Sequence, residues 1–323
     1  MGKTGDTLSE NAVMAIGQEL YLKHLRESMS KSTFRVYGAQ MRAFTAWCAE
    51  HGLPAFPSDG AAVAAYVERM IAEKKSVSSI RQALAAISKA HAAMRFPDPV
   101  RTDYVRAASA AAARSMGRAP HRKRALRIDD IALMLDYITG DEAKDVRDRA
   151  LLSVGFMGAF RRSELSELRV SDLSSATDRH GRTAIVVTLR HSKTDQTGER
   201  AQRKALFHTR RADAVAMLDE WLRFAVLSGD DPVFCRVRKG GHVVKEPITG
   251  ENISLIIKKR AREAGLTGDI AGHSLRRGFI TSALKEGATE RSVMHQTGHR
   301  SVTVMRGYQE LNDVTEDNAA EAF

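Results

Sequence analysis

Tyr308, His299, Arg276 and His273 lie within one short stretch near the C-terminal end of the sequence. A tyrosine hydroxyl can attack phosphorus once its proton is removed and the charge that develops on the phosphoryl oxygens is neutralised. Arginine can hold two phosphate oxygens at once, and an imidazole can accept or donate a proton near neutral pH. Together these side chains predict attack of tyrosine on a phosphodiester without a metal ion.

The order of these residues is more specific than any single one of them. The pattern His-x-x-Arg occurs three times, beginning at residues 121, 208 and 273, so it carries little information alone. Only His273 is followed by a Gly-His pair and then by a tyrosine near the chain end, and no other tyrosine follows Tyr137. The alternative is that Tyr308 is an aromatic side chain packed at the edge of a core.

His273-x-x-Arg276, Gly298-His299 and Tyr308 nine residues later resemble box II of the tyrosine site-specific recombinases, the phage integrase family. Upstream, the order Arg-x-x-Glu-Leu that begins at residue 161 resembles box I of that family. The likeness makes Arg161 a phosphate ligand and Glu164 a residue that fixes the geometry of the site. Arg162 stands where the family usually has an apolar residue, so either arginine could serve. The register with Glu164 favours Arg161.

A hairpin is expected between the two boxes. Residues 183–190 are rich in Ile, Val and Thr, which predicts a strand, and residues 192–198 turn the chain back into a second strand over 202–207. A lysine at the tip of this hairpin resembles the catalytic lysine of the family. Lys193 could protonate the departing 5′-oxygen as a general acid, and Lys204 is the alternative.

The resemblance implies a complete reaction. Tyr308 would attack a DNA phosphate to give a 3′-phosphotyrosine and a free 5′-hydroxyl, while Arg161, Arg276 and His299 hold the non-bridging oxygens. His273 would contact the phosphate or act as the base. No cofactor, metal ion or ATP is expected. A metal site at His295 and His299 is rejected, because a glycine interrupts the helix between them and no carboxylate completes the set.

Composition agrees with a nucleic-acid partner. The 323 residues carry 50 Lys and Arg against 39 Asp and Glu, a net charge of +11, which favours a polyanion: DNA or RNA first, and an anionic membrane second. Cys48 and Cys235 give no disulfide framework and suit a reducing compartment. No signal peptide is apparent, and no apolar run approaches the roughly 20 residues that span a bilayer. We expect a cytoplasmic, nucleoid-associated protein.

The expected fold is mainly α and has two domains. Residues 1–119 should form a helical domain that resembles the SAM-like core-binding domain of Cre-like members of the family, and residues 120–323 a mixed α+β catalytic domain with a small antiparallel sheet. Periodic apolar residues in the first domain predict helices over residues 9–26, 34–47, 61–72, 76–94 and 101–116.

Three basic or polar regions are predicted to contact DNA: outward helix faces of the first domain, the acid-free linker over residues 114–127, and the helix over residues 253–264. A solvated surface is the alternative at each position. The predicted contacts are Arg35, Arg42, Ser79, Arg81, Gln82, Lys89, Arg118, Arg122, Lys123, Arg124, Lys258, Lys259 and Arg260.

The sequence after Tyr308 is acidic, with five Asp or Glu and no Lys or Arg over residues 309–323. It resembles the family's C-terminal tail, which docks on a neighbouring protomer. The resemblance then implies a homotetramer that pairs two double-stranded, inverted-repeat DNA sites and exchanges strands through a Holliday junction. Two alternatives stay open, namely an enzyme like the type IB topoisomerases without strand exchange, and a DNA-binding protein without activity. Integration, dimer resolution and inversion are all compatible with the sequence.

Overall fold

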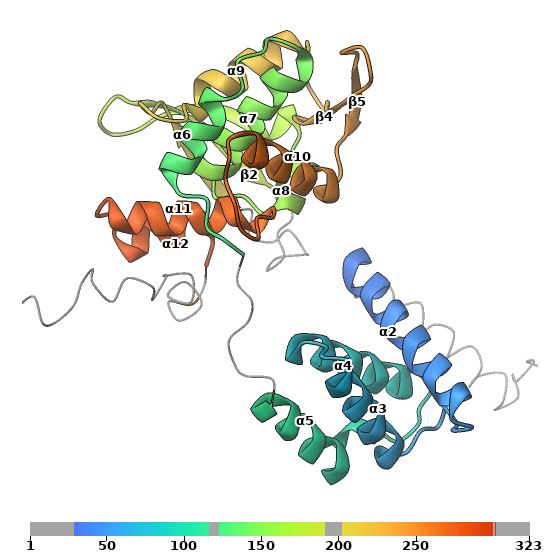
Figure 1. Ribbon diagram of the computed structural model, residues 1–323. Coiled ribbons are helices and arrows are strands. Elements are labelled where there is room, and N and C mark those ends of the chain that lie inside the picture. Colours follow the sequence, from blue (N-terminus) through green and yellow to red (C-terminus); the bar gives the residue numbers. More distant parts are fainter. Residues whose placement is uncertain (1–28, 116–122, 191–201, 300, 302–323) are drawn as a thin grey trace, which may run out of the picture. The chain divides into compact units, whose positions relative to one another are not determined.

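The chain divides into two compact units, Met1–Pro120 and His121–Phe323. A computed structural model describes residues 29–115, 123–190, 202–299 and 301 (Figure 1). The expected boundary was between residues 119 and 120. The first expected helix, over residues 9–26, lies outside the described residues. The other elements confirm a mainly helical fold with a small antiparallel sheet in the second unit.

The N-terminal unit is built from helices that begin where polar side chains cap them. Ser30, Asp59 and Ser76 each accept a hydrogen bond from a backbone N–H in the first turn of the helix that follows. The apolar faces of these helices enclose a core of aromatic and aliphatic side chains that includes Phe44 and Tyr66. The elements are α2 (Lys31–Glu50), α3 (Gly60–Ala72), α4 (Val77–Ala93), a 3-10 turn (Pro99–Arg101) and α5 (Asp103–Ser115).

Helix α7 (Ala143–Met157) lies at the centre of the C-terminal unit, and most of its residues are buried. It packs against α9 (Ala214–Phe224) on one side and α11 (His273–Lys285) on the other, as Figure 1 shows. Because α7 is buried on nearly all sides, its apolar residues show no clear single face in the sequence. The other helices of this unit are α6 (Ile128–Asp136), α8 (Arg162–Glu167), α10 (Gly250–Glu263) and α12 (Glu290–Thr297), with a 3-10 turn (Val170–Asp172) after α8.

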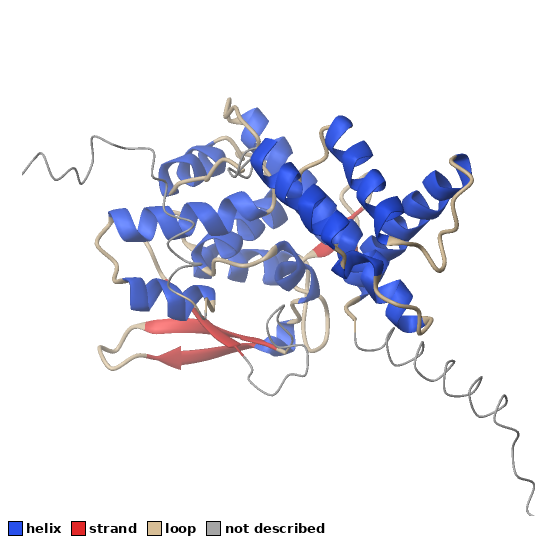
Figure 2. Ribbon diagram, turned by 90° about the horizontal axis from the view of Figure 1, so that it is seen from below, coloured by secondary structure: helices blue, strands red, loops and turns tan. Residues whose placement is uncertain are grey.

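The predicted hairpin is present as β2 (Thr183–Leu189) and β3 (Gln202–Phe207), which pair antiparallel. A strand that the sequence analysis did not predict, β1 (Leu173–Thr177), pairs with the other edge of β2. This three-stranded sheet lies at one edge of the helical body (Figure 2). A second, separate antiparallel pair is formed by β4 (Cys235–Val237) and β5 (Val243–Pro247).

Helix α11 is held against the segment that enters the C-terminal unit. The Leu126 N–H donates to the Ser274 carbonyl at 3.1 Å, and Gly278 lies so close that an added Cβ would be 1.6 Å from the Leu126 oxygen. Only glycine permits this approach of helix to backbone. The contact fixes the position and direction of α11.

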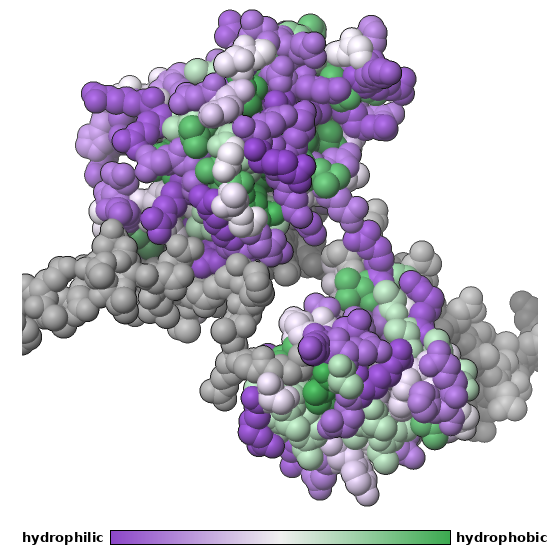
Figure 3. All heavy atoms as spheres, in the orientation of Figure 1, coloured by the Kyte–Doolittle hydropathy of each residue, from purple (hydrophilic) through white to green (hydrophobic). Residues whose placement is uncertain are grey.

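The visible surface of the C-terminal unit is mostly hydrophilic, with scattered apolar side chains (Figure 3). Among the described ranges, no helix combines the length and apolar character that a bilayer crossing requires. Cys48 and Cys235 are both buried and free.

Candidate active site

Arg276 lies in the first turn of α11 and is fully buried. Its Nη1 donates to the Ala159 carbonyl at 2.8 Å, and its Nη2 donates to the Thr297 carbonyl at 2.6 Å. A buried cation is tolerated only where polar groups replace its hydration. The guanidinium thus joins three elements: α11, the turn after α7 and the C-terminal end of α12.

Lys204 makes a parallel connection from β3. Its Nζ donates to the carbonyls of Gly158 and Gln296, both at 2.8 Å, and lies 4.9 Å from the centre of the Phe160 ring. Burial, together with the positive charges of the neighbouring arginines, lowers the pKa of Lys204 to about 7, against the opposing effect of the Glu164 carboxylate. Lys204 therefore lies near charged residues of both boxes, Glu164 and Arg161 of box I and Arg276 of box II, but its hydrogen bonds go to backbone carbonyls.

Arg161 immediately precedes α8 and is fixed by Glu164. The buried Glu164 carboxylate accepts from the Arg161 backbone N–H at 2.9 Å and from its Nη1 at 2.5 Å. Arg162 is exposed and turns toward Ser254 of α10, with 3.5 Å between its Nη1 and the serine oxygen. Of the two candidate arginines, Arg161 is the one that the structure places with Glu164.

His299 contacts the same group of cations. Its Nε2 lies 3.2 Å from Arg276 Nη2, and its Nδ1 lies 2.9 Å from the Thr297 hydroxyl, which donates to the Val293 carbonyl. Because arginine can only donate, Nε2 accepts and the ring proton is on Nδ1. Burial, and then the charges of Arg276, Arg161, His273 and Lys204 in that order, lower the pKa of His299 to about 4. The ring is therefore neutral at pH 7.

His273 begins α11 and is exposed. It lies three residues before Arg276, which places both side chains on one side of the helix. Its electrostatic effect on His299 locates it near the same site. The described residues thus bring together Arg161, Glu164, His273, Arg276 and His299 from α8, α11 and the end of α12.

Two of the predicted catalytic residues, Tyr308 and Lys193, lie outside the described residues, as do the predicted DNA contacts Arg118 and Arg122. Their positions relative to the site remain predictions.

Most of the other predicted DNA contacts are exposed, and their role at DNA stays a prediction. The exposed ones are Arg35, Arg42, Arg81, Gln82, Lys89, Lys258 and Lys259. Ser79 is half-buried, and its hydroxyl lies 2.9 Å from that of Ser76 at the start of α4. Lys123 and Arg124 bind Asp269 and Asp130 within the C-terminal unit, so they anchor the end of the linker.

The prediction for Arg260 was wrong. Its side chain is buried and forms ion pairs with Asp145, Asp148 and Glu263 at 2.6, 2.8 and 3.1 Å. Two of these carboxylates are on α7, so Arg260 joins α10 to the core. All three nitrogens of the Arg260 guanidinium are paired with carboxylates, which neutralise its charge, so this side chain is not available to a DNA phosphate.

Sequence reasoning missed the roles of Gln296 and Thr297. Gln296 Nε2 donates to the Met157 and Ala205 carbonyls at 2.9 Å, and Thr297 orients the His299 ring. Their position next to Gly298-His299 was the only available signal. Among the residues that the structure describes, no group of three or more His, Cys, Asp or Glu side chains could hold a metal ion.

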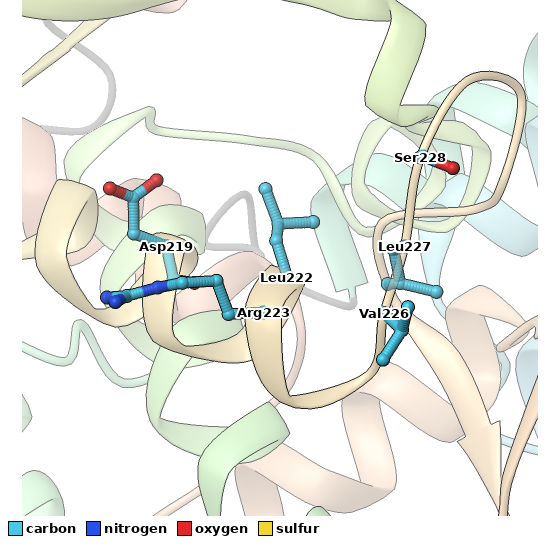
Figure 4. Close-up of a pocket in the computed structure, with 6 residues that line it drawn as sticks. All are labelled: Asp219, Leu222, Arg223, Val226, Leu227 and Ser228. Carbon is cyan, nitrogen blue, oxygen red and sulfur yellow. The ribbon is translucent and has the colours of Figure 1, made fainter.

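One hollow among the described residues lies away from this chemistry. It has a volume of about 410 Å³ and is lined by Asp219, Leu222, Arg223 and residues 226–228 at the end of α9 (Figure 4). A smaller hollow of about 230 Å³ adjoins Glu164 and includes Asp172 and Arg190. Arg190 is paired with Asp172, so the positive charge of this hollow is already balanced. Catalysis on DNA needs an open cationic surface, so hollow size does not identify the site.

The lowered pKa of His299 predicts a loss of stability in acid. Because the folded-state pKa of His299, about 4, is below the ordinary histidine value of 6.5, the folded protein binds fewer protons than the unfolded chain between these pH values. The associated stability is complete above pH about 6.5 and is lost as the pH falls toward 4. The full difference would be about 3 kcal/mol, which we reduce to about 1 to 2 kcal/mol because the ring is only half-buried.

Urea unfolding at pH 7 and pH 4.5 measures this difference. The native protein should lose about 1 to 2 kcal/mol more than His299→Gln, which cannot titrate at this position. His295→Gln, at an exposed histidine of α12, is the matched control and should follow the native protein. Equal losses in the native protein and His299→Gln would show that the His299 pKa is not lowered.

Comparison with known proteins finds similarity over nearly the whole chain. The model of the phage integrase family matches residues 124–314, and the model of the phage integrase N-terminal SAM-like domain matches residues 19–95. An integrase/recombinase xerD homolog of Selenomonas ruminantium is 30% identical over 321 residues, which cover 97% of this chain and 92% of that protein. Recombinase cre of Escherichia phage P1 is 24% identical over 305 residues, 88% and 85% of the two chains.

Among solved structures, a lambda integrase (75–356) dimer bound to a COC′ core site has a similar fold. It has a TM-score of 0.62 and 19% sequence identity, with 91% of this chain and 96% of that chain covered. The family match covers more than half of the chain and includes both boxes. This chain therefore belongs to the phage integrase family and is a tyrosine site-specific recombinase.

Proposed function

We propose that the protein cleaves and rejoins duplex DNA through a covalent bond to Tyr308. The tyrosine oxygen would attack the scissile phosphorus while the bond from phosphorus to the 5′-oxygen breaks. The products of this step are a 3′-phosphotyrosine and a free 5′-hydroxyl. Attack by the 5′-hydroxyl of a partner strand reverses the chemistry and restores Tyr308, so the bond energy is kept and no ATP is needed.

The observation that carries this proposal is the Arg276–His299 contact at 3.2 Å, with Arg161 acting on the same imidazole. Three side chains from separate parts of the chain thereby converge on one small region. The site contains Arg161, Lys204 and Arg276 against one buried carboxylate, Glu164. This excess of positive charge suits an anion that gains charge in the transition state.

In the proposed reaction Arg161, Arg276 and His299 bind the non-bridging oxygens. A bound phosphodiester would bring negative charge beside His299, opposing the cations that lower its pKa. The ring could then donate to a phosphate oxygen. His273, exposed at the start of α11, would contact the phosphate or take the proton from Tyr308.

Lys193 is the proposed general acid for the departing 5′-oxygen. Lys204, the alternative considered from the sequence, is 1% exposed and donates to two backbone carbonyls. To protonate a DNA strand it would have to leave both carbonyls and the Phe160 ring. The buried position of Lys204 therefore supports the hairpin lysine in this role.

The proposed partner is double-stranded DNA with an inverted-repeat target, bound by four protomers that exchange strands through a Holliday junction. A solved lambda integrase tetramer bound to a Holliday junction has a similar fold (TM-score 0.62), which supports this assembly by analogy. The acidic segment 309–323 would dock on a neighbouring protomer. Its five carboxylates complement a body of net positive charge. We expect this protein to work in the cytoplasm, in association with the nucleoid.

The docking proposal predicts separate effects on binding and assembly. A chain truncated after residue 309 should bind one target site as the full chain does, because the removed segment is acidic and adds nothing to phosphate binding. It should fail to form the species that contains two DNA sites, as resolved by sedimentation. Normal assembly of the truncated chain would show that the tail is not the docking element.

Tyr308→Phe tests the chemistry. A duplex selected from random sequence by the full-length protein is nicked near the cleavage position, so that the released short strand diffuses away and traps the covalent complex. Without metal or ATP, the native protein should give a covalent protein–DNA band, and Tyr308→Phe should give none because it lacks the attacking oxygen.

Tyr137→Phe is the matched control, because Tyr137 is an exposed tyrosine that follows α6. It should form the band as the native protein does. A band of undiminished strength with Tyr308→Phe would assign the nucleophile elsewhere. Tight binding to the selected duplex without any band from native protein would indicate a DNA-binding protein without this activity.

A further inference from the structure

The two turns that carry Arg161 and His299 are joined by two cations in the same way. Lys204 donates to Gly158 O and Gln296 O, and Arg276 donates to the next carbonyl in each turn. For Arg276 these acceptors are Ala159 O and Thr297 O. Consecutive carbonyls of two separate segments are therefore bridged in register by two neighbouring side chains.

The chemistry of helix ends explains why cations are needed there. The last carbonyls of a helix have no partner within the helix, and the C-terminal end carries partial negative charge. Helices α7 and α12 both end at this site, at Met157 and Thr297. Their C-terminal ends would repel each other across a buried gap unless positive donors separated them.

The carbonyls at the end of α7 are all satisfied, from residue 154 to residue 159. Backbone N–H groups of the following turn satisfy the first three, at 2.8 to 3.0 Å. Gln296 Nε2 satisfies the fourth, Met157 O, at 2.9 Å. Lys204 and Arg276 satisfy the last two. Lys204 is thus one member of a complete set, and its removal would leave Gly158 O without this donor in a buried place.

We infer that Lys204 is a positioning residue, which holds the Gly158–Arg161 turn and the Gln296–His299 turn at the separation that one phosphate requires. This inference rests on the proposed function of the site. Lys204 does not touch the substrate. It acts through the backbone on which Arg161 and His299 stand, and its contact with the Phe160 ring fixes the residue immediately before Arg161.

Arg276 cannot hold the two turns at this separation alone, because it is itself a proposed phosphate ligand. When its guanidinium binds phosphate, its bonds to Ala159 O and Thr297 O are the ones most open to rearrangement. A second cation that donates only to backbone carbonyls keeps the two turns in place while the hydrogen bonds of Arg276 rearrange. Lys204 has this character, because both of its hydrogen bonds go to backbone carbonyls and it is not a proposed phosphate ligand.

Hydrogen exchange without DNA tests the positioning directly. Lys204→Met roughly keeps the length of the side chain and removes the ammonium group that donates both hydrogen bonds. Amide exchange should accelerate by about tenfold or more in peptides covering residues 157–161 and 294–299, and remain native in α9. Lys239→Met, at an exposed lysine between β4 and β5, is the matched control. Native protection of both turns in Lys204→Met would overturn the inference.

Cleavage kinetics then test the consequence. On the nicked selected duplex, Lys204→Met should form the covalent complex at least about thirtyfold more slowly, with a Kd for DNA within about twofold of native. Lys204→Arg, which restores charge and donors, should recover most of the rate. A rate within threefold of native, or a loss of affinity that accounts for the slower rate, would contradict a positioning role.

A substitute variant and a separate readout ensure that the experiments give a clear result. If Lys204→Met does not fold, Lys204→Gln replaces it, because its amide retains a donor and should give a smaller effect in both turns. If native protein forms no covalent complex, the proposed function fails, while the exchange measurement still decides whether Lys204 holds the two turns.

Discussion

The ends of two helices, α7 and α12, meet in the interior of the C-terminal unit, and positive side chains must lie between them. This constraint places Arg276 and Lys204 where they are, since each satisfies one carbonyl from each helix end. A buried carbonyl without a partner costs roughly 1 to 3 kcal/mol, so four such groups would be severe for a domain of ordinary stability. The same constraint gives the site its excess of positive charge. A site that must carry buried cations for structural reasons is already suited to a phosphate.

The grouping of the proposed phosphate-binding residues within each box could be predicted from sequence because their geometry is local. His273 and Arg276 are three residues apart on one helix, and Glu164 is three residues after Arg161. Spacing within one turn determines which side chains share a side, and this does not depend on the rest of the fold. The choice of Arg161 over Arg162 also followed from register, and the structure places Arg161 with Glu164.

The contacts that hold these elements together could not be found in this way. Lys204 meets Gly158 and Gln296 across long separations in sequence, and its partners are backbone carbonyls, which every residue has. Arg260 was assigned to DNA because it follows two lysines, but the helix turns it inward toward α7. Strand β1 was missed because its five residues show no alternation of buried and exposed side chains. In each case tertiary packing determines the contact or the strand, and the local sequence pattern does not predict it.

The central claim is that Arg161 and its neighbours neutralise the charge of a DNA phosphate. It can be measured with two nicked duplexes that differ in one non-bridging oxygen of the scissile phosphate, replaced by a methyl group that removes the negative charge. Covalent complex formation by native protein and Arg161→Ala is followed on both. We expect Arg161→Ala to be slower by about 100-fold or more on the charged phosphate and by less than about tenfold on the neutral one, since removing one such donor typically costs 100- to 1,000-fold. Equal losses on the two duplexes would contradict charge neutralisation and assign Arg161 a structural role.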